Sequence, residues 1–230
     1  MSGQGGSTIP ASLTLDVFSD VVCPWCYLGK RRLERALSLV PEIDVTVRWR
    51  PFQLDSTIPQ GGIERRVYLE RKFGGPEAIA PTHRRMTEMG ATEGIEYHFE
   101  RIARSPNTLD AHRVIRWSAT AGHEEATVER LFRAYFSEGL DIGDHSVLSR
   151  LAGEAGLDES VVASRLATDE DREAVEAEIA EAYRIGVTGV PCFVIASRYA
   201  VMGAQAPETI VRTLRSVAEE LTGAGAAAAG

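Results

Sequence analysis

The spacing of hydrophobic positions divides the chain into two strand-bearing ends and a helical middle. Residues 13–17 alternate apolar and polar side chains, as in a half-buried β-strand. Residues 28–40 carry an apolar stripe at helical spacing, Pro41 ends it, and residues 43–49 alternate again. The order strand, helix, strand predicts two parallel strands joined by a crossover helix.

The middle of the chain, residues 63–185, shows no strand-like alternation that persists. Apolar stripes at helical spacing recur in it, at residues 68–73, 128–136, 147–151, 161–166 and 175–183. We therefore expect a helical insertion between the two ends.

Strand character returns after this insertion. Residues 192–195 form a continuous apolar run, which indicates a strand buried on both faces, and residues 199–202 suit its antiparallel partner. Pro207 opens the last helix, whose apolar stripe ends at Leu221. The order β-α-β, helices, β-β-α predicts an α/β protein with a thioredoxin fold and an inserted α-helical domain.

The predicted domain boundaries follow from these elements. Residues 13–62 and 186–221 form a discontinuous thioredoxin-like domain, and residues 63–185 form the helical insertion domain. Segments 1–12 and 222–230 are rich in Gly, Ser and Ala. We expect them to be mobile tails, because they cannot bury enough apolar surface to offset the entropy lost on ordering.

Composition and charge narrow the choice of partners. The 230 residues are 44% hydrophobic and 25% charged, and the formal net charge is −8. This charge argues against a nucleic-acid partner, which needs a basic face, and against adsorption to anionic membranes. No apolar run approaches the ~20 residues of a membrane helix. Residues 1–12 lack the basic region and apolar core of a secretory signal, so a cytoplasmic location is expected.

The most informative motif is Cys23-Pro24-Trp25-Cys26, which follows the first strand and heads the first helix. At a helix N-terminus, free N–H groups and the macrodipole favour a thiolate, and such placement lowers a cysteine pKa to roughly 3.5–7.5. We expect Cys23 to be the exposed attacking thiol and Cys26, one turn deeper, to resolve the mixed disulfide. Pro24 suits the first helical turn, and Trp25 is expected to present an apolar surface to the substrate.

A lone Cys-x-x-Cys indicates either redox chemistry or half of a zinc site. A zinc site needs a second pair of ligands. The third cysteine, Cys192, has no histidine beside it, and the five histidines are scattered through the predicted insertion. We therefore expect thiol redox chemistry and no bound metal.

A proline stands at the entrance of the strand predicted at residues 192–195. An X–Pro bond is cis in only about 5–6% of cases in folded proteins, and a trans proline that starts a strand is the alternative. The combination of Val190-Pro191 with the cysteine motif favours a cis bond. That bond would expose the Val190 backbone for strand-like pairing with a substrate segment.

Four segments carry a family resemblance: VFSDVVCPWCYLG at 17–29, SPNT at 105–108 with AHR at 111–113, GVTGVP at 186–191, and YAVMGAQ at 199–205 with PE at 207–208. With them the chain resembles the DsbA family of thioredoxin-fold oxidoreductases, most of all its FrnE-like branch. The resemblance implies Cys23 as nucleophile, Cys26 as resolving thiol and Pro191 as the cis-proline. The same superfamily includes 2-hydroxychromene-2-carboxylate isomerase and kappa-class glutathione transferases. Those enzymes typically have a serine in place of Cys23, so the intact cysteine pair favours dithiol chemistry.

Five more residues have two interpretations each. The resemblance suggests that Asn107 and Thr108 lie near the active-site groove, whereas the same residues suit a turn that caps the following helix. Asp16 and Asp20 are candidate proton relays to Cys26; alternatively, Asp16 faces solvent and Asp20 caps the first helix. Cys192 is either a small buried hydrophobe or a third redox thiol that approaches Cys23.

Three functions follow, in order of preference. The first is a cytoplasmic protein-disulfide oxidoreductase or isomerase that exchanges disulfides with protein dithiols, binds no cofactor and is served by thioredoxin or glutathione. The second is a glutathione-linked isomerase or polyketide-modifying enzyme, which takes a small aromatic substrate in a pocket between Cys23 and the insertion. The third is a non-enzymatic chaperone or zinc-binding stress protein. Either a monomer or a homodimer is compatible with the fold.

Overall fold

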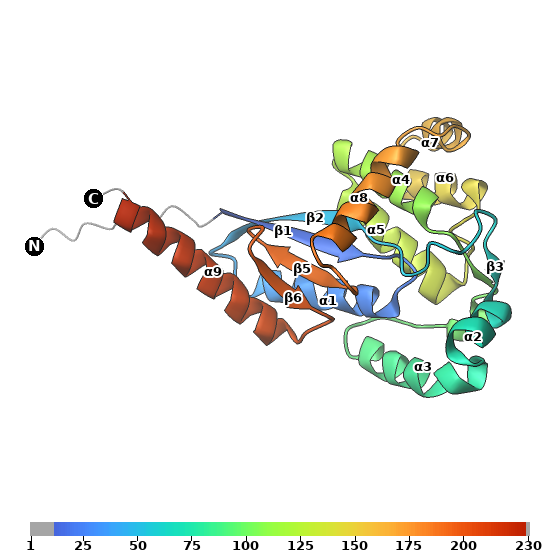
Figure 1. The fold of residues 1–230 in the computed structure, drawn as a ribbon, viewed down its shortest axis with the longest axis horizontal. Coiled ribbons are helices and arrows are strands. Elements are labelled where there is room, and N and C mark those ends of the chain that lie inside the picture. The colour runs from blue at the N-terminus through green and yellow to red at the C-terminus, as the bar shows by residue number, and fades with distance from the viewer. Residues whose placement is uncertain (1–11, 229–230) are drawn as a thin grey trace, which may run out of the picture.

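A four-stranded mixed sheet forms the centre of the molecule in the computed structural model, which describes residues 12–228 (Figure 1). Its strand order is β2-β1-β5-β6. β1 (Ser12–Ser19) pairs in parallel with β2 (Asp44–Pro51) and antiparallel with β5 (Cys192–Ile195), which pairs antiparallel with β6 (Tyr199–Met202). The parallel pair confirms the predicted crossover, which runs through α1 (Pro24–Ser38).

The last helix, α9 (Pro207–Ala228), packs against α1 on one face of the sheet. It runs past Leu221, so the prediction that a tail begins at residue 222 is wrong for residues 222–228. Alanine, the best helix former, fills four of the seven positions from 222 to 228. The rest of the two expected tails, residues 1–11 and 229–230, lies outside the described residues, and Ser12 already belongs to β1.

The residues between β2 and β5 are mainly helical and lie at the end of the sheet opposite the start of β1 (Figure 1). The α-helices are α2 (Arg65–Phe73), α3 (Pro76–Ala91), α4 (Leu109–Thr120), α5 (Glu124–Arg133), α6 (His145–Glu154), α7 (Glu159–Leu166) and α8 (Arg172–Arg184). A 3-10 turn, η1 (Phe99–Arg101), and a π-helical turn, η2 (Ala134–Glu138), complete the set.

This helical region also contains a small antiparallel ribbon. β3 (Ile63–Glu64) pairs with β4 (Arg104–Ser105), so the predicted helical insertion also contains two short strands that the sequence analysis missed. Two-residue strands are too short for alternation of apolar and polar residues to show in a sequence. The ribbon places the segment before α4 beside the start of α2.

One apolar cluster joins the sheet to the insertion. Leu15 on β1 and Leu28 on α1 belong to the same buried cluster as Phe132 on α5 and Phe136 on η2. Tyr27, next to the cysteine motif, stacks on Phe132 with ring centroids 5.0 Å apart. Each large apolar side chain buried in this way contributes about 1.5–3 kcal/mol, so the sheet and the insertion stabilise each other.

A buried lysine on α1 also links the thioredoxin-like part to the insertion through ion pairs. Lys30 on α1 is 2% exposed and forms ion pairs with Glu34, Glu125 and Glu129; its Nζ lies 3.0 Å from Glu129 Oε2. Buried charges are tolerated when they are paired. The pairs fix α5 against the helix that carries the cysteines.

The other face of the sheet is covered only in part. Phe18 on β1 and Cys192 on β5 point to this face, where they pack with Phe52, Ala182 and Val187 under the end of α8. Between residues 12 and 228, none of the helices is both long and apolar enough to pass through a membrane.

Candidate active site

The cysteine motif stands at the start of α1. Cys23 occupies the N-cap position, with extended backbone angles, and its N–H donates to Asp20 O at 2.9 Å. Its side chain makes no cap hydrogen bond, and the residue stands beside the first N–H groups of the helix. Those groups and the helix dipole favour negative charge on the Cys23 sulfur.

Cys26 lies one turn further along and is 1% exposed. Burial raises its pKa well above the usual range, and the Cys23 sulfur, which accepts a hydrogen bond from Cys26, raises it further. The Ser19 hydroxyl and the Asp20 backbone N–H act in the opposite direction. The environment therefore holds the proton on Cys26.

Cys23 is 3% exposed, so the prediction that it is an exposed thiol is wrong. The insertion and the loop after β2 cover it. Cys23 instead lines a partly open cavity of about 370 Å³, together with Pro24 and Trp25. This volume lies within the ~300–1,000 Å³ of small-molecule sites. We call it the front cavity.

The walls of the front cavity come from distant parts of the chain. Its apolar lining includes Val22, Leu54, Ile58, Phe73, Ile79, Pro106 and Val190. Three polar side chains, Arg65, Tyr68 and Lys72, project into it from α2. Sequence reasoning missed these three as site residues, although their spacing of three and four residues places them on one helix face.

Burial shifts the pKa of two more residues that line the front cavity. Burial, with help from the nearby Arg65 charge, lowers the pKa of His83 to about 4, so its imidazole is neutral at neutral pH. His83 stacks on Phe99 with ring centroids 4.0 Å apart. Burial raises the pKa of Tyr135 to about 12, and its hydroxyl donates to Arg104 O at 3.3 Å. Tyr135 sits on the π-helical turn, a feature frequent at functional sites.

The proline loop lies directly against the attacking thiol. The Val190–Pro191 peptide bond is cis. Cys23 Sγ lies 3.7 Å from Val190 O, and Val190 also lines the front cavity. The structure thus brings together Cys23, Pro24, Trp25 and Val190.

Asn107 and Thr108 take different places. Thr108 lines the front cavity and is the N-cap of α4, but its side chain makes no cap hydrogen bond. Asn107 supplies that bond, because its Oδ1 accepts from Leu109 N at 2.9 Å. Asn107 also bonds Gln53 and Ile58, which ties down the loop after β2, and it is not among the lining residues.

The two aspartates predicted as candidate proton relays lie in different places. Asp20 is 1% exposed and lines the front cavity; its Oδ2 accepts from Leu54 N at 2.8 Å, and its Oδ1 lies 3.7 Å from His112 Nε2. Asp16 forms a bidentate ion pair with Arg48, at 3.0 and 2.9 Å. Alternation along β1 directs Asp16 to the face away from α1, so the structure does not bring it to Cys26.

Cys192 is buried on that same far face of the sheet. It packs among Phe18, Phe52 and Val187, whereas Cys23 and Cys26 belong to the cluster on the α1 side. Burial raises the pKa of Cys192. This placement matches a packing residue and does not bring Cys192 to the motif. Among residues 12–228, we find no group of three or more His, Cys, Asp or Glu side chains arranged to hold a metal ion.

The sheet order, the dithiol at a helix N-terminus and the proline loop beside it define a thioredoxin-fold protein with a helical insertion. Residues 14–215 match the family model of the DSBA-like thioredoxin domain, and the chain belongs to that family.

Solved structures support the assignment. The "probable DsbA oxidoreductase SCO1869" of Streptomyces coelicolor is 32% identical, with a TM-score of 0.82 and 89% of each chain covered. A 2-hydroxychromene-2-carboxylate isomerase is 16% identical, with a TM-score of 0.69, over 91% of this chain and 98% of its own. The cytosolic disulfide reductase DsbM of Pseudomonas aeruginosa, solved with GSH, is 24% identical, with a TM-score of 0.60, over 88% of this chain and 98% of its own. The last two share the fold with this chain.

Proposed function

We propose that the protein is a thiol–disulfide oxidoreductase that exchanges disulfides through Cys23 and Cys26. The observation that carries the proposal is the asymmetry of the pair. Cys23 stands at the N-terminus of α1 and opens into a cavity, whereas Cys26 is sealed in the core and burial raises its pKa. Disulfide exchange needs one cysteine that attacks as a thiolate and a second, resolving cysteine that attacks only after the mixed disulfide has formed.

The reaction runs in two displacements. The Cys23 thiolate attacks one sulfur of a substrate disulfide, and the other sulfur leaves as a thiolate. Cys26, once deprotonated, then attacks Cys23 Sγ, which forms the Cys23–Cys26 disulfide and releases the second substrate thiol. The same steps in reverse oxidise a substrate dithiol.

Three single variants test this proposal with insulin as the disulfide substrate and dithiothreitol as the reductant. Cys23→Ser is expected to abolish reduction. Cys26→Ser, mixed with insulin before any dithiothreitol is added, is expected to trap a mixed disulfide on Cys23, detectable as an added mass that dithiothreitol then removes. Cys192→Ala is the matched control and should keep the activity. Full activity of Cys23→Ser would overturn the proposal.

A second candidate is a glutathione-linked reaction on a small aromatic molecule. The front cavity favours it, because its lining is mainly apolar yet contains the cations of Arg65 and Lys72, which suit a carboxylate. We keep glutathione as a proposed co-substrate and the reducing cytoplasm as the proposed site of action. The test is turnover of a hydroxychromene carboxylate with glutathione by Cys26→Ser protein; turnover would favour this candidate over disulfide exchange.

A further inference from the structure

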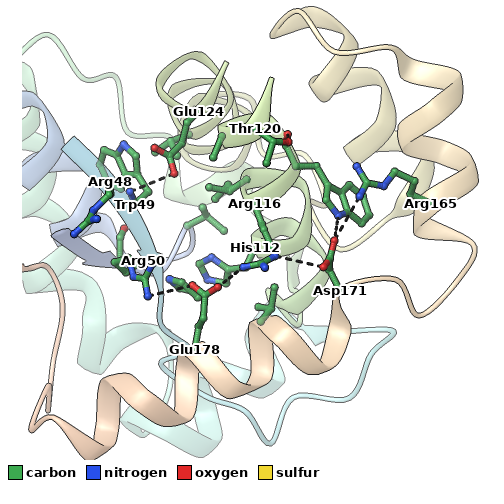
Figure 2. Close-up of a pocket in the computed structure, with 18 residues that line it drawn as sticks. Arg48, Trp49, Arg50, His112, Arg116, Thr120, Glu124, Arg165, Asp171 and Glu178 are labelled. Atoms are coloured by element: carbon green, nitrogen blue, oxygen red, sulfur yellow. Dashed lines mark hydrogen bonds and ion pairs between the residues drawn. The ribbon is translucent and has the colours of Figure 1, made fainter. Parts of the chain in front are cut away.

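A second cavity lies between β2 and helices α4, α5 and α8 (Figure 2). Its volume is about 540 Å³, and Figure 2 shows Arg116 directed towards Asp171, whose carboxylate lies 3.4 Å away. The three cysteines, all within the described residues, do not line this cavity. A disulfide that entered it would meet no thiol, so of the two cavities the front one gives access to Cys23.

Exposure divides the front cavity into a floor and a rim. Cys23, at 3% exposed, lies on the floor, whereas Leu54 and Phe73 are 39% and 43% exposed and mark the rim. Leu54 belongs to the loop after β2, residues 52–62, and Phe73 to the last turn of α2. A substrate on its way from solvent to Cys23 therefore passes this loop and the end of α2.

Lys72 ties the two sides of the rim together. Its Nζ donates to Leu54 O at 3.2 Å and lies 3.6 Å from Asp55 Oδ2. All three residues line the front cavity, so the contact spans its mouth. The ammonium also lies 5.2 Å from the ring centroid of Tyr68, one turn earlier on α2, which favours this position of the charge. We call the contact of Lys72 with Leu54 and Asp55 the latch.

The loop side of the latch is fixed to the rest of the molecule. The Leu54 N–H donates to Asp20 Oδ2 at 2.8 Å, and Asn107 Nδ2 donates to Ile58 O at 2.7 Å. Asp20 follows β1 directly, and Asn107 precedes α4. The loop is thus anchored to the sheet and to the insertion at two points, and it forms a fixed edge of the mouth.

The α2 side of the latch has less buried surface to hold it. Within Arg65–Phe73 one residue, Leu69, is buried, and the buried residues of α3, Met86 and Gly90, lie in its second half. The turn between the two helices consists of Gly74 and Gly75, with φ of 83° and 115°. Segments that bury little apolar surface open at low free-energy cost. The end of α2 can therefore move away from the loop once the latch is broken.

The size of the closed cavity decides what fits beneath the latch. Its volume of about 370 Å³ suits a small-molecule disulfide. A disulfide in a polypeptide brings its flanking residues with it, and an extended backbone alone takes up about 4.8 Å, the spacing of neighbouring strands. Those residues would cross the rim where Lys72 meets Leu54. A protein disulfide therefore needs an open mouth, whereas a small disulfide does not.

We infer that Lys72 latches the front cavity and sets which disulfides react with Cys23. While the latch is closed, a small-molecule disulfide reaches the sulfur; a protein disulfide reaches it after the end of α2 has moved away from the loop. This inference rests on the proposed disulfide exchange and adds its substrate preference. The displacement is unchanged: Cys23 Sγ forms the new S–S bond, and the other substrate sulfur leaves with the electron pair of the broken one. Lys72 is thus a specificity-determining residue that acts through access to Cys23.

The test measures one displacement at one thiol. In a Cys26→Ser/Cys192→Ala background Cys23 is the single thiol, because the chain has three cysteines. This protein is mixed with the neutral 2-hydroxyethyl disulfide or with insulin, and mass spectrometry follows the mixed disulfide on Cys23. A neutral probe is chosen because the carboxylates of the aromatic disulfide DTNB would respond to the Lys72 charge. The ratio of the two rates, insulin to small disulfide, reports the state of the latch.

Lys72→Met should raise this ratio about fivefold, the largest shift expected from loss of a partly exposed ion pair. A change in Cys23 reactivity caused by the missing charge affects both rates and cancels in the ratio. Asp55→Asn breaks the ion pair from the loop side and keeps an acceptor for the Thr57 N–H, so it should give a smaller rise. Lys72→Arg retains the cation and should keep the ratio of the background protein.

Arg66→Met is the matched control for removal of a cation from α2. Arg66 pairs with Glu70 and does not line the front cavity, so its loss leaves the latch intact and the ratio unchanged. An unchanged ratio in Lys72→Met, or an equal rise in Arg66→Met, would overturn the inference alone. A background protein that forms a mixed disulfide with neither probe would overturn the proposed function and the inference together.

Discussion

Gly29 on α1 lies directly against Pro191: a Cβ at position 29 would stand 2.8 Å from Cγ of Pro191 and 3.2 Å from the ring of Phe193. The absence of a side chain therefore lets the helix that carries both cysteines approach the loop that faces Cys23. No flexible side-chain end is available to yield, since the nearest atoms belong to a proline ring and a buried aromatic ring.

Gly29→Ala should therefore separate α1 from the proline loop. Overpacking of this kind costs about 1–3 kcal/mol, and the added separation should slow attack by Cys23. Urea unfolding and the rate of DTNB reduction measure the two effects. Gly61→Ala is the control, because its Cβ would meet no atom within 4 Å. An equal loss of stability and rate in both variants would show that the contact between Gly29 and Pro191 is not the cause.

Tyr97 supports the motif from the insertion. Its hydroxyl donates to Pro24 O at 2.6 Å, and the residue is 5% exposed. Tyr97→Phe should lower the free energy of unfolding by about 0.5–1.5 kcal/mol, since it removes the hydrogen bond from the buried Tyr97 side chain to Pro24 O. Tyr199→Phe removes a hydroxyl that pairs with Glu220 on the surface, and should change stability by less than about 0.5 kcal/mol. Equal effects in chemical denaturation would contradict the supporting role.

Cys192 is expected to act by packing alone. Cys192→Ala should destabilise the fold by about 1 kcal/mol, because it removes one buried heavy atom from the cluster around Phe18 and Phe52. The reduction potential of the Cys23–Cys26 pair and the number of thiols lost on oxidation at that pair should not change. A shift in that potential, measured by equilibration with glutathione, would show a redox role.

His83 makes stability depend on pH in the acid range. Its pKa is about 4 in the folded protein and 6.5 in the reference state. Between these values the unfolded chain binds a proton that the folded chain does not, so stability falls as pH drops from 6.5 to 4 and the effect levels off below 4. Allowing for the partial exposure of His83, the loss is on the order of 1–2 kcal/mol.

The variant His83→Phe keeps a ring to stack on Phe99 but cannot titrate. Its free energy of unfolding, from urea titrations at pH 4.5 and 7, should therefore fall less between these pH values than that of the wild type. If the free energy of unfolding fell by the same amount in both proteins, His83 would not be the cause of the pH dependence.

The parts of the structure that local patterns encode were predictable. The bounds of β5 and β6 match the predicted strands at 192–195 and 199–202, because each strand is a short apolar or alternating run between turn residues. The position of the cysteine motif between a predicted strand and a predicted helix placed Cys23 at the start of α1, where the structure has it. The ribbon of β3 and β4 was missed because strands of two residues leave no alternation.

The environment of the site needed the tertiary structure. Arg65, His83 and Tyr135 meet Cys23 only after the insertion folds back over the motif. Asp16 looked like a relay because it is an acid on β1, whereas the one-residue alternation of the strand directs it to the wrong face.

The single apolar cluster that spans Leu28 and Phe132 limits how this architecture can be rebuilt. Excising the helices between β2 and β5, or grafting those of a relative, would remove the aromatic side chains that pack on α1. The buried face of α1 would then be exposed to water. A working chimera must therefore exchange the contacting side chains of α1 together with the graft. In the intact protein, the two parts are expected to melt in one cooperative transition.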